Sequence, residues 1–576
     1  MSNTNTILEP AAVTSPASLA SVNGGECERL LNIGIFFDGT NNNHHELDAS
    51  VDTNISKLFK AYRDMPHEGH FPQYVSGVGT PFVELRREHA EPGGGPFGAG
   101  GEARILYGLL HIINVAYRVI KENRFRYFDN EKLNALCSDA QVFEHLGESS
   151  GQPTKDQQVL RDLGLPDGLV GASDVFKKKF FSQECARLHE LLANRKTCPI
   201  VKSIYFDVFG FSRGAAQARV FVTWLHRYML MGGQIFGVPS YVRMLGLFDT
   251  VASVGPSDAA ASDGHHTWAS AENLQIHPAV KNCVHYIALH ELRTNFPSDS
   301  VRVGDTLPPN CHEHITPGAH SDVGGGYAPL DQGKGVRLLK GTLEPVADAD
   351  MRLSNMPLQA MYAAARRSCL NHPYEPWLDI NEDEDLRETF GISQQDQLLD
   401  QVTKYFDRCG VPAGLPIHVA LREHGMRYLA WRYVINDAKR FNKLDSVQRA
   451  EMYPSTYKHY KMGQEIFSDQ VSALKADRLD PSFNVKAPEI FQAVRALARS
   501  LQPKALQEMG TFFDDWVHDS YAGFIGQFYK NGKDSTWNAF TLDLAERQGY
   551  MRWRNIYQGD NFGLNFPQSV APRAQQ

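Results

Sequence analysis

Short apolar runs that alternate with helix-like segments constrain the fold of this chain more than any other feature. Five runs have the length and residue types of buried strands, and they lie at residues 30–43 (ending in a tight loop), 73–80, 201–209, 242–251 and 283–291. Helix-like or loop segments separate them. Strands that alternate with helices form mainly parallel sheets covered on both faces. The sequence therefore predicts an α/β fold, with a mainly parallel sheet flanked by helices.

The chain of 576 residues exceeds the usual size of one domain, so we expect two or three structural units, or one core with large insertions. Residues 1–26 lack periodicity and are predicted to form a mobile tail. Residues 27–335 are assigned to the sheet-containing core, with an irregular and helical insertion at about 130–195. The charged, helix-like segment 336–510 is predicted to be a largely helical inserted module. The aromatic segment that opens 511–576 is predicted to pack back on the core.

Composition narrows the classes of function. A net charge of −8 argues against nucleic acid as the main ligand. The eight cysteines contain no C-x-x-C pair, which is typical of reduced thiols in a protein made in the cytosol. The N-terminus lacks the basic and apolar regions of a secretory signal, and the most apolar helix-like run, 105–117, is shorter than the roughly 20 residues that span a bilayer. We therefore expect neither Sec export nor an integral membrane protein.

The segment FDVFGFSRGAAQARVF, residues 206–221, passes from an apolar strand-like run to a helix-like run through a turn that contains Ser212. Gly210 and Gly214 flank this serine in the pattern G-x-S-x-G. A serine on a sharp strand-to-helix turn stands clear of the sheet, where its hydroxyl can attack a carbonyl. Only about 0.2 such matches are expected by chance in a chain of this length. The alternative is a purely structural role, in which Ser212 caps the helix.

Ser212, Asp249 and His320 are the candidate catalytic residues, because each follows an apolar strand-like run. Functional groups gather at the carboxyl ends of strands in open parallel sheets. The chain order Ser, Asp, His is that of α/β hydrolases. His320 would take the proton of the Ser212 hydroxyl, and Asp249 would orient the imidazole and stabilise its charged form. The pattern thus favours acyl transfer through a serine nucleophile.

An oxyanion formed during acyl transfer needs hydrogen-bond donors. We assign one donor to the Arg213 amide, directly after the nucleophile, and another to Gly39 or Thr40 in the loop after the first strand.

Other residues compete for these roles. His518 and His290 are alternative bases, although a helical or strand-core role is expected for both. Glu291 and Asp322 are alternative acids to Asp249. Asp38 is expected to organise its own turn.

Two further motifs are weak. The stretch GGGPFG at 93–98 fits G-x-G-x-x-G, but it contains Pro96 and follows no strand, so we predict no dinucleotide site and no cofactor. CHEH at 311–314 lacks the helical spacing of H-E-x-x-H, so we assign no metal.

Six motifs in a fixed order carry a resemblance to a known family: FFDGTNNN, GVGT, the glycine-rich loop before a helix, GFSRGAA, LFDTVASVG and PGAHSDVGGGY. Together they resemble the first family of type VI secretion lipase effectors, which are antibacterial phospholipases related to a wider group of α/β hydrolases. The resemblance spans about residues 31–330, with a weaker echo at WVHDSYAGF.

The resemblance implies an α/β-hydrolase core interrupted by modules that help the enzyme meet a membrane. It also implies a Ser212–Asp249–His320 triad that cleaves acyl esters of glycerophospholipids, without a cofactor. Such effectors are loaded on a secretion spike protein, act in the periplasm of a rival cell, and are neutralised in the producer by a cognate immunity protein. Two other hypotheses are an intracellular esterase of soluble esters and a non-enzymatic adaptor that binds the spike.

Overall fold

A computed structural model provides the structure of the chain. The structure describes residues 28–45, 52–87, 89, 99–138, 154–193, 200–253, 265, 267–293, 296–338, 345–347, 351–369, 377–381, 383–391, 396–476, 487–522, 550–559 and 563–564. The glycine-rich motif at 93–98 and the predicted tail 1–26 lie outside this part of the chain.

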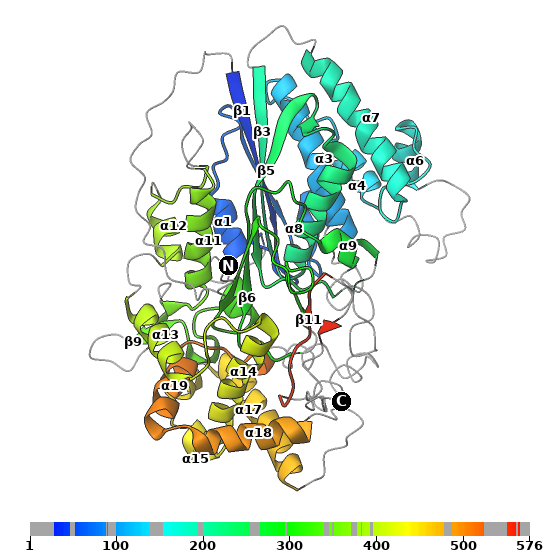
Figure 1. Cartoon of the computed structure of the whole chain (residues 1–576). Coiled ribbons are helices and arrows are strands. Elements are labelled where there is room, and N and C mark those ends of the chain that lie inside the picture. The colour runs from blue at the N-terminus through cyan, green and yellow to red at the C-terminus, as the bar shows by residue number, and fades with distance from the viewer. Residues whose placement is uncertain are drawn as a thin grey trace, which may run out of the picture.

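A central parallel sheet organises the molecule (Figure 1). Its strands lie in the order β2-β1-β3-β5-β6-β8, and every neighbouring pair on this path is parallel. The strands are β1 (Glu28–Phe37), β2 (His70–Val75), β3 (Ile200–Phe211), β5 (Val238–Phe248), β6 (Cys283–Ala288) and β8 (Cys311–Thr316). The predicted α/β fold with a mainly parallel sheet is confirmed.

The last strand of this path, β8, is absent from the sequence prediction, which ended the sheet at 283–291. Its residues, CHEHIT, include the motif considered above for a metal. The polar residues of this segment do not resemble a buried strand in the sequence. In the structure, however, Glu313 is buried and accepts hydrogen bonds from the Ser300 hydroxyl and the Val301 amide. His320 therefore follows a sixth parallel strand and not the fifth.

Helices cover both faces of the sheet (Figure 1). On one face, α3 (Gly101–Ile120), α7 (Asp174–Ala193) and α8 (Arg213–Trp224) share a core with Ile33, Ile35 and Phe37 of β1. On the other face, α1 (Asn54–Ala61) and α11 (Asn355–Arg367) pack with Phe36 and residues of β3, β5 and β6. The period of two along β1 thus sends alternate side chains into two cores.

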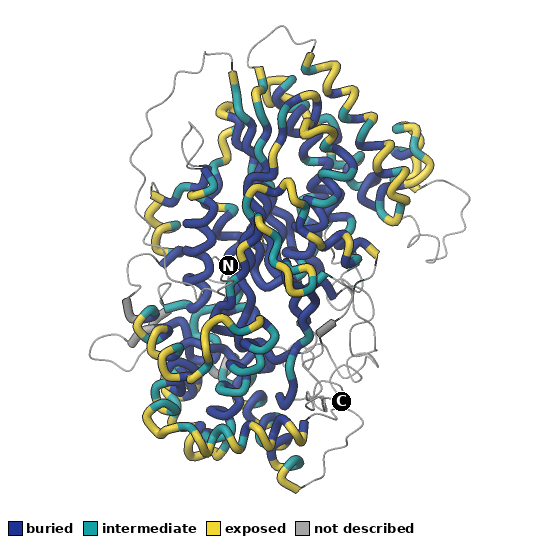
Figure 2. Tube along the Cα trace, viewed as in Figure 1, coloured by how far each residue is buried: buried dark blue, intermediate teal, exposed yellow. Residues whose placement is uncertain are grey.

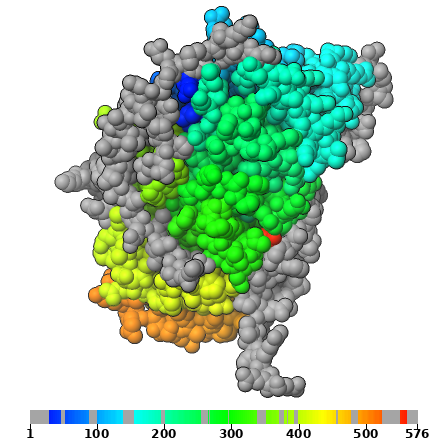
Figure 3. Space-filling model, turned by 45° about the horizontal axis from the view of Figure 1, so that its top comes forward, coloured from blue at the N-terminus to red at the C-terminus, as the bar shows by residue number. Residues whose placement is uncertain are grey.

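The described part of the chain contains further α-helices and strands. The helices are α4 (Asn130–Leu136), α6 (Lys155–Asp162), α9 (Ala271–Leu274), α10 (His320–Gly324), α12 (Glu384–Thr389), α13 (Asp396–Arg408), α14 (Ile417–Val434), α15 (Ala438–Phe441), α16 (Asp445–Glu451), α17 (Pro454–Lys475), α18 (Ala487–Ser500) and α19 (Pro503–Asp515). The remaining strands are β4 (Gln234–Ile235), β7 (Ser298–Asp299), β9 (Val336–Leu338), β10 (Pro345–Ala347), β11 (Ile556–Tyr557) and β12 (Gly563–Leu564). Helices α6 and α7 project at one corner and α14 to α19 lie at the opposite end (Figure 3).

One apolar core runs from the sheet into the helices beyond residue 350. It contains Phe36 and Tyr286 of the sheet together with Tyr405, Phe467 and Phe513 of the helices. Figure 2 shows this buried interior continuing between the two parts. In the described part of the aromatic segment that opens 511–576, the large apolar side chains are buried: Phe512, Phe513, Trp516, Val517 and Tyr521.

Helix α3 is the one helix among the described residues that is long and apolar enough to cross a membrane. However, 78% of its apolar window is buried inside the protein, as is typical of a core helix.

The sheet order places a switch point between β1 and β3. The chain passes from β1 to β2 on one side of this point, and from β3 to β5 on the opposite side. Ligands of open α/β sheets bind in the crevice beyond the carboxyl ends of the strands at such a point. The strand ends nearest this crevice lead directly to Asp38, Ser212 and Asp249.

Candidate active site

Ser212 occupies a tight turn between β3 and α8. Its backbone has φ 58° and ψ −127°. Residues other than glycine rarely adopt this conformation, which costs on the order of 1–3 kcal/mol. Its side chain makes no capping hydrogen bond to the helix, which removes the support for a role as a mere cap. The strained backbone is what a serine nucleophile on a sharp turn requires.

Gly210 and Gly214 allow this turn because the chain passes itself at close range. A Cβ on Gly210 would lie 2.3 Å from the Gly214 carbonyl oxygen. A Cβ on Gly214 would lie 2.3 Å from the Phe37 oxygen and 2.4 Å from the Asp38 oxygen. Each glycine is thus required by close approach of the backbone, and Gly214 seats α8 against the end of β1.

Gly214→Ala is expected to lower the free energy of unfolding by about 3 kcal/mol, because the added methyl group fits only if α8 moves away from β1. Denaturant unfolding measures the loss. In the control Gly232→Ala, the new Cβ meets no atom within 4 Å, so only the strain of a positive φ, about 1 kcal/mol, is expected. Equal losses in the two variants would contradict the close-packing argument.

Asp249 and His320 meet at the carboxyl ends of β5 and β8. His320 is the first residue of α10, and its Nδ1 lies 2.6 Å from Asp249 Oδ2. Both side chains are buried, at 4% and 0% exposure. The carboxylate therefore fixes the tautomer in which Nδ1 carries the proton, and His320 Nε2 is left as an acceptor without a hydrogen-bond partner.

Ser212 lies beside this pair, although no hydrogen bond joins its hydroxyl to His320. The ring of Phe211, its neighbour in the chain, contacts the His320 ring at a centroid distance of 4.7 Å. The Ser212 carbonyl accepts from the Val251 amide, two residues beyond Asp249, at 3.2 Å. Catalytic hydrogen bonds are often long in unliganded enzymes and tighten with substrate.

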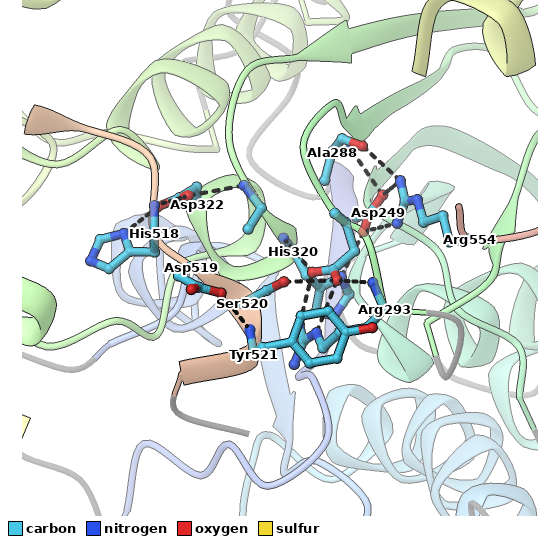
Figure 4. A network of polar contacts seen from close by, with 12 residues as sticks. Asp249, Ala288, Arg293, His320, Asp322, His518, Asp519, Ser520, Tyr521 and Arg554 are labelled. Atoms are coloured by element: carbon cyan, nitrogen blue, oxygen red, sulfur yellow. Dashed lines mark hydrogen bonds and ion pairs between the residues drawn. The ribbon is translucent and has the colours of Figure 1, made fainter. Parts of the chain in front are cut away.

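Two buried arginine–carboxylate ion pairs lie at the Asp249–His320 pair, and one of them includes Asp249 itself (Figure 4). Arg554 donates from Nη1 to Asp249 Oδ2 and from Nη2 to Asp249 Oδ1, both at 2.8 Å. Glu291 accepts the His320 amide at 3.2 Å and pairs with Arg293 at 2.9 Å. Sequence reasoning did not find Arg554 or Arg293, because neither belongs to a motif with fixed spacing.

These surroundings shift the pKa values of the pair in one direction. Burial alone raises the pKa of Asp249, but the charge of Arg554 and the hydrogen bonds from His320 and Arg554 outweigh it and hold the pKa well below its usual range. Burial lowers the pKa of His320, although Asp249 opposes this shift. The unliganded site thus favours a carboxylate beside a neutral imidazole, which is the protonation state of a general base.

The loop after β1 carries the other predicted oxyanion donors. The Gly39 amide donates to Asp38 Oδ1 at 2.7 Å, so it is already engaged. Thr40 Oγ1 is a buried hydroxyl without a hydrogen-bond partner. Arg213 is the first residue of α8 and follows Ser212 directly.

Asp38 supports this loop. It is buried and accepts from the Tyr74 hydroxyl at 2.6 Å and from the Thr53 hydroxyl at 2.8 Å. Burial raises its pKa to about 6, with these hydrogen bonds opposing the shift. Asp38 therefore holds its turn, as the sequence predicts, and its backbone oxygen lies close to Gly214 in the turn that contains Ser212.

The alternative acids and bases have other partners. Asp322 accepts a hydrogen bond from His518 Nδ1 at 2.6 Å, and the Tyr327 ring stacks on the His518 ring at a centroid distance of 3.9 Å. His290 accepts the Gly318 amide through Nδ1 and contacts the Tyr405 hydroxyl at 2.9 Å through Nε2. We expected both histidines to lie in a helix or in the core of a strand. Instead, His518 follows α19 and His290 follows β6.

No group of three or more potential metal ligands gathers among the described residues. On β8, the alternation of a strand separates exposed His312 from buried Cys311 and Glu313.

Comparison with known proteins relates one segment of the chain to a described family. A family model described as "T6SS, Phospholipase effector Tle1-like, catalytic domain" matches residues 233–364, which include Asp249 and His320 but not Ser212. A search of curated proteins found no match.

Two solved structures are similar. A crystal structure of an uncharacterized protein from Pseudomonas aeruginosa has 22% identity and a TM-score of 0.67, covering 92% of this chain and 80% of that one. This similarity shows a shared fold. A structure of the Tle1 effector bound to the VgrG spike from the type 6 secretion system has 21% identity and a TM-score of 0.25, covering 53% of this chain and 52% of that one. A TM-score of this size does not establish a common fold. Residues 233–364, which include two of the three candidate catalytic residues, are thus similar to the catalytic domain of Tle1-like phospholipase effectors of type VI secretion.

Proposed function

We propose that the protein is a serine phospholipase A that hydrolyses acyl esters of membrane glycerophospholipids through Ser212, His320 and Asp249. The observation that carries the proposal is the juxtaposition of a strained serine turn with a buried imidazole whose Nε2 lacks a partner. The match of residues 233–364 to a phospholipase catalytic domain supports phospholipids as the substrate class.

The chemistry proceeds in two halves. His320 Nε2 takes the proton of the Ser212 hydroxyl as its oxygen attacks the ester carbonyl, and the same proton passes to the departing lysophospholipid oxygen. The Arg213 amide and the Thr40 hydroxyl would stabilise the oxyanion. Water, activated by His320, then attacks the acyl-enzyme and releases a fatty acid. Asp249 stabilises the imidazolium in both halves.

Delivery and target are part of the same proposal. The family description names a type VI secretion effector, so we infer that the chain leaves its producer on a spike protein and attacks membranes of rival bacteria from the periplasm. An enzyme of this kind requires a cognate immunity protein in the producer. Residues 336–510 are the predicted region of membrane contact.

A labelling and product experiment tests the activity. The wild-type protein is expected to form a covalent adduct with an alkyl fluorophosphonate on Ser212, located by peptide mass spectrometry. It is also expected to release free fatty acid and lysophospholipid from vesicles of phosphatidylethanolamine and phosphatidylglycerol. Turnover of short soluble esters without vesicle hydrolysis would identify an esterase. Absence of both the adduct and turnover would favour the adaptor.

The rate should persist into mildly acidic solution. Burial lowers the pKa of His320 from its ordinary value of 6.5, so the neutral base survives below that pH. We expect kcat/KM toward a soluble ester to fall to half at a pH below 6.5. A half-maximal pH above 7 would contradict the assignment of His320 as the base.

A further inference from the structure

Arg554 makes the closest contacts to Asp249 of any side chain beyond the proposed triad (Figure 4). We propose that Arg554 is a positioning residue for this triad, which fixes the Asp249 carboxylate and balances its charge. The inference rests on the proposed function, because it assigns Arg554 a part in the work of His320.

The hydrogen bonds to Asp249 use its full accepting capacity. Oδ1 accepts from Arg554 Nη2 at 2.8 Å and from the Ala288 amide at 2.9 Å. Oδ2 accepts from Arg554 Nη1 at 2.8 Å and from His320 Nδ1 at 2.6 Å. Arg554 Nη2 also donates to the Ala288 carbonyl at 2.8 Å. A carboxylate with two donors on each oxygen has one orientation, and only a planar guanidinium supplies the paired bonds.

A paired strand anchors Arg554 in this place. Two residues later, β11 pairs in parallel with β7, with Ile556 opposite Ser298. The Ser298 amide donates to the Asn555 carbonyl at 2.8 Å, and the Asp299 amide donates to the Thr250 carbonyl at 2.9 Å. Backbone pairing therefore links the segment that bears Arg554 to the residue that follows Asp249.

The charge of Arg554 also has a chemical consequence. The positive charge of Arg554 lies beside the Asp249 carboxylate, which would otherwise stabilise a protonated His320 more strongly. Because the Arg554 side chain is 1% exposed, water screens this charge little. A fixed positive charge beside a carboxylate and imidazole disfavours protonation of the pair. Arg554 thus helps to keep His320 neutral and able to act as a base.

The other charged groups around His320 do not replace this effect. Glu291 and Arg293, from the segment after β6, form a bidentate pair of opposite charges. Asp322, on α10 itself, is paired with His518 from the segment after α19. Among the described groups facing Asp249, Arg554 is the cation in direct contact.

The test compares pH profiles of kcat/KM for the full chain with a soluble ester. Arg554→Gln is expected to raise the pH of half-maximal rate on the acid side by about one unit or more. The control Arg243→Gln breaks another buried bidentate pair, with Asp207, away from the site, and is expected to lose stability without moving that pH. An unchanged or lower midpoint in Arg554→Gln would overturn the inference.

Arg554→Lys keeps the proposal testable if the glutamine variant does not fold. Lysine retains the charge but not the fork, so we expect a midpoint near that of wild type and a kcat per titrated serine about tenfold lower. An unchanged kcat per titrated serine would overturn the positioning role. Titration with fluorophosphonate separates this failure from failure of the proposed function, because a wild-type protein that is hydrolytically inert and unlabelled at Ser212 would reject the triad itself.

Discussion

Ser212→Ala is expected to lower kcat for phospholipid hydrolysis by about 10⁶-fold, because triad serines elsewhere act as a unit with their histidine and lose activity of this order. The residual rate would come from substrate binding and the oxyanion donors alone. Fatty-acid release from phosphatidylglycerol vesicles, followed by mass spectrometry, measures the loss. Stability should change little or rise, since alanine removes no hydrogen bond to the helix and leaves the backbone of the turn in place.

Ser203→Ala is the matched control for this variant. Ser203 lies on the same strand, β3, and its hydroxyl donates to the neighbouring Lys202 carbonyl at 2.8 Å. This variant is expected to hydrolyse vesicles at the wild-type rate. Retention of more than a few per cent of the activity in Ser212→Ala, with the control active, would show that another group attacks the ester.

Asp249→Asn is expected to lower kcat by about 10⁴-fold, the cost of presenting the wrong imidazole tautomer to the nucleophile. It should also lower the free energy of unfolding by about 3–5 kcal/mol, because the buried Arg554 loses its counter-charge. Vesicle hydrolysis and chemical denaturation measure the two effects separately. Rates are normalised to folded protein by circular dichroism.

The control Asp207→Asn removes a carboxylate from the buried pair with Arg243, inside the sheet. We expect a comparable loss of stability with kcat per folded molecule unchanged. If Asp249→Asn lost stability to the same degree and kept its kcat, Asp249 would be a structural partner of Arg554 and another acid would have to orient His320.

Local patterns explain what could be predicted from the sequence. The turn at Ser212 is encoded within sixteen residues by an apolar strand, two glycines and a helix that follows. Asp249 was found because it ends an apolar run that forms β5. The boundaries were less accurate: the run predicted at 73–80 is a strand at His70–Val75, displaced because residues after Val75 turn toward the loop that follows β1.

Contacts between distant residues explain what could not be predicted. β8 escaped detection because its buried Glu313 reads as a polar residue until its hydrogen-bond partners are known. Arg554 lies 305 residues beyond Asp249 in the chain, within a stretch that has no apolar periodicity. The acid at the centre of the site was therefore visible in the sequence, whereas the cation that holds it was not.

The pairing of β11 with β7 has a consequence for synthesis. Domains generally fold from the N-terminus as the chain leaves the ribosome. The sheet, with Ser212, Asp249 and His320, can assemble before residues 550–557 have been translated, but the strand that carries Arg554 to the carboxylate cannot. A nascent polypeptide that ends before residue 550 consequently holds Asp249 without its guanidinium clamp, and maturation of the site awaits translation of residues 550–557.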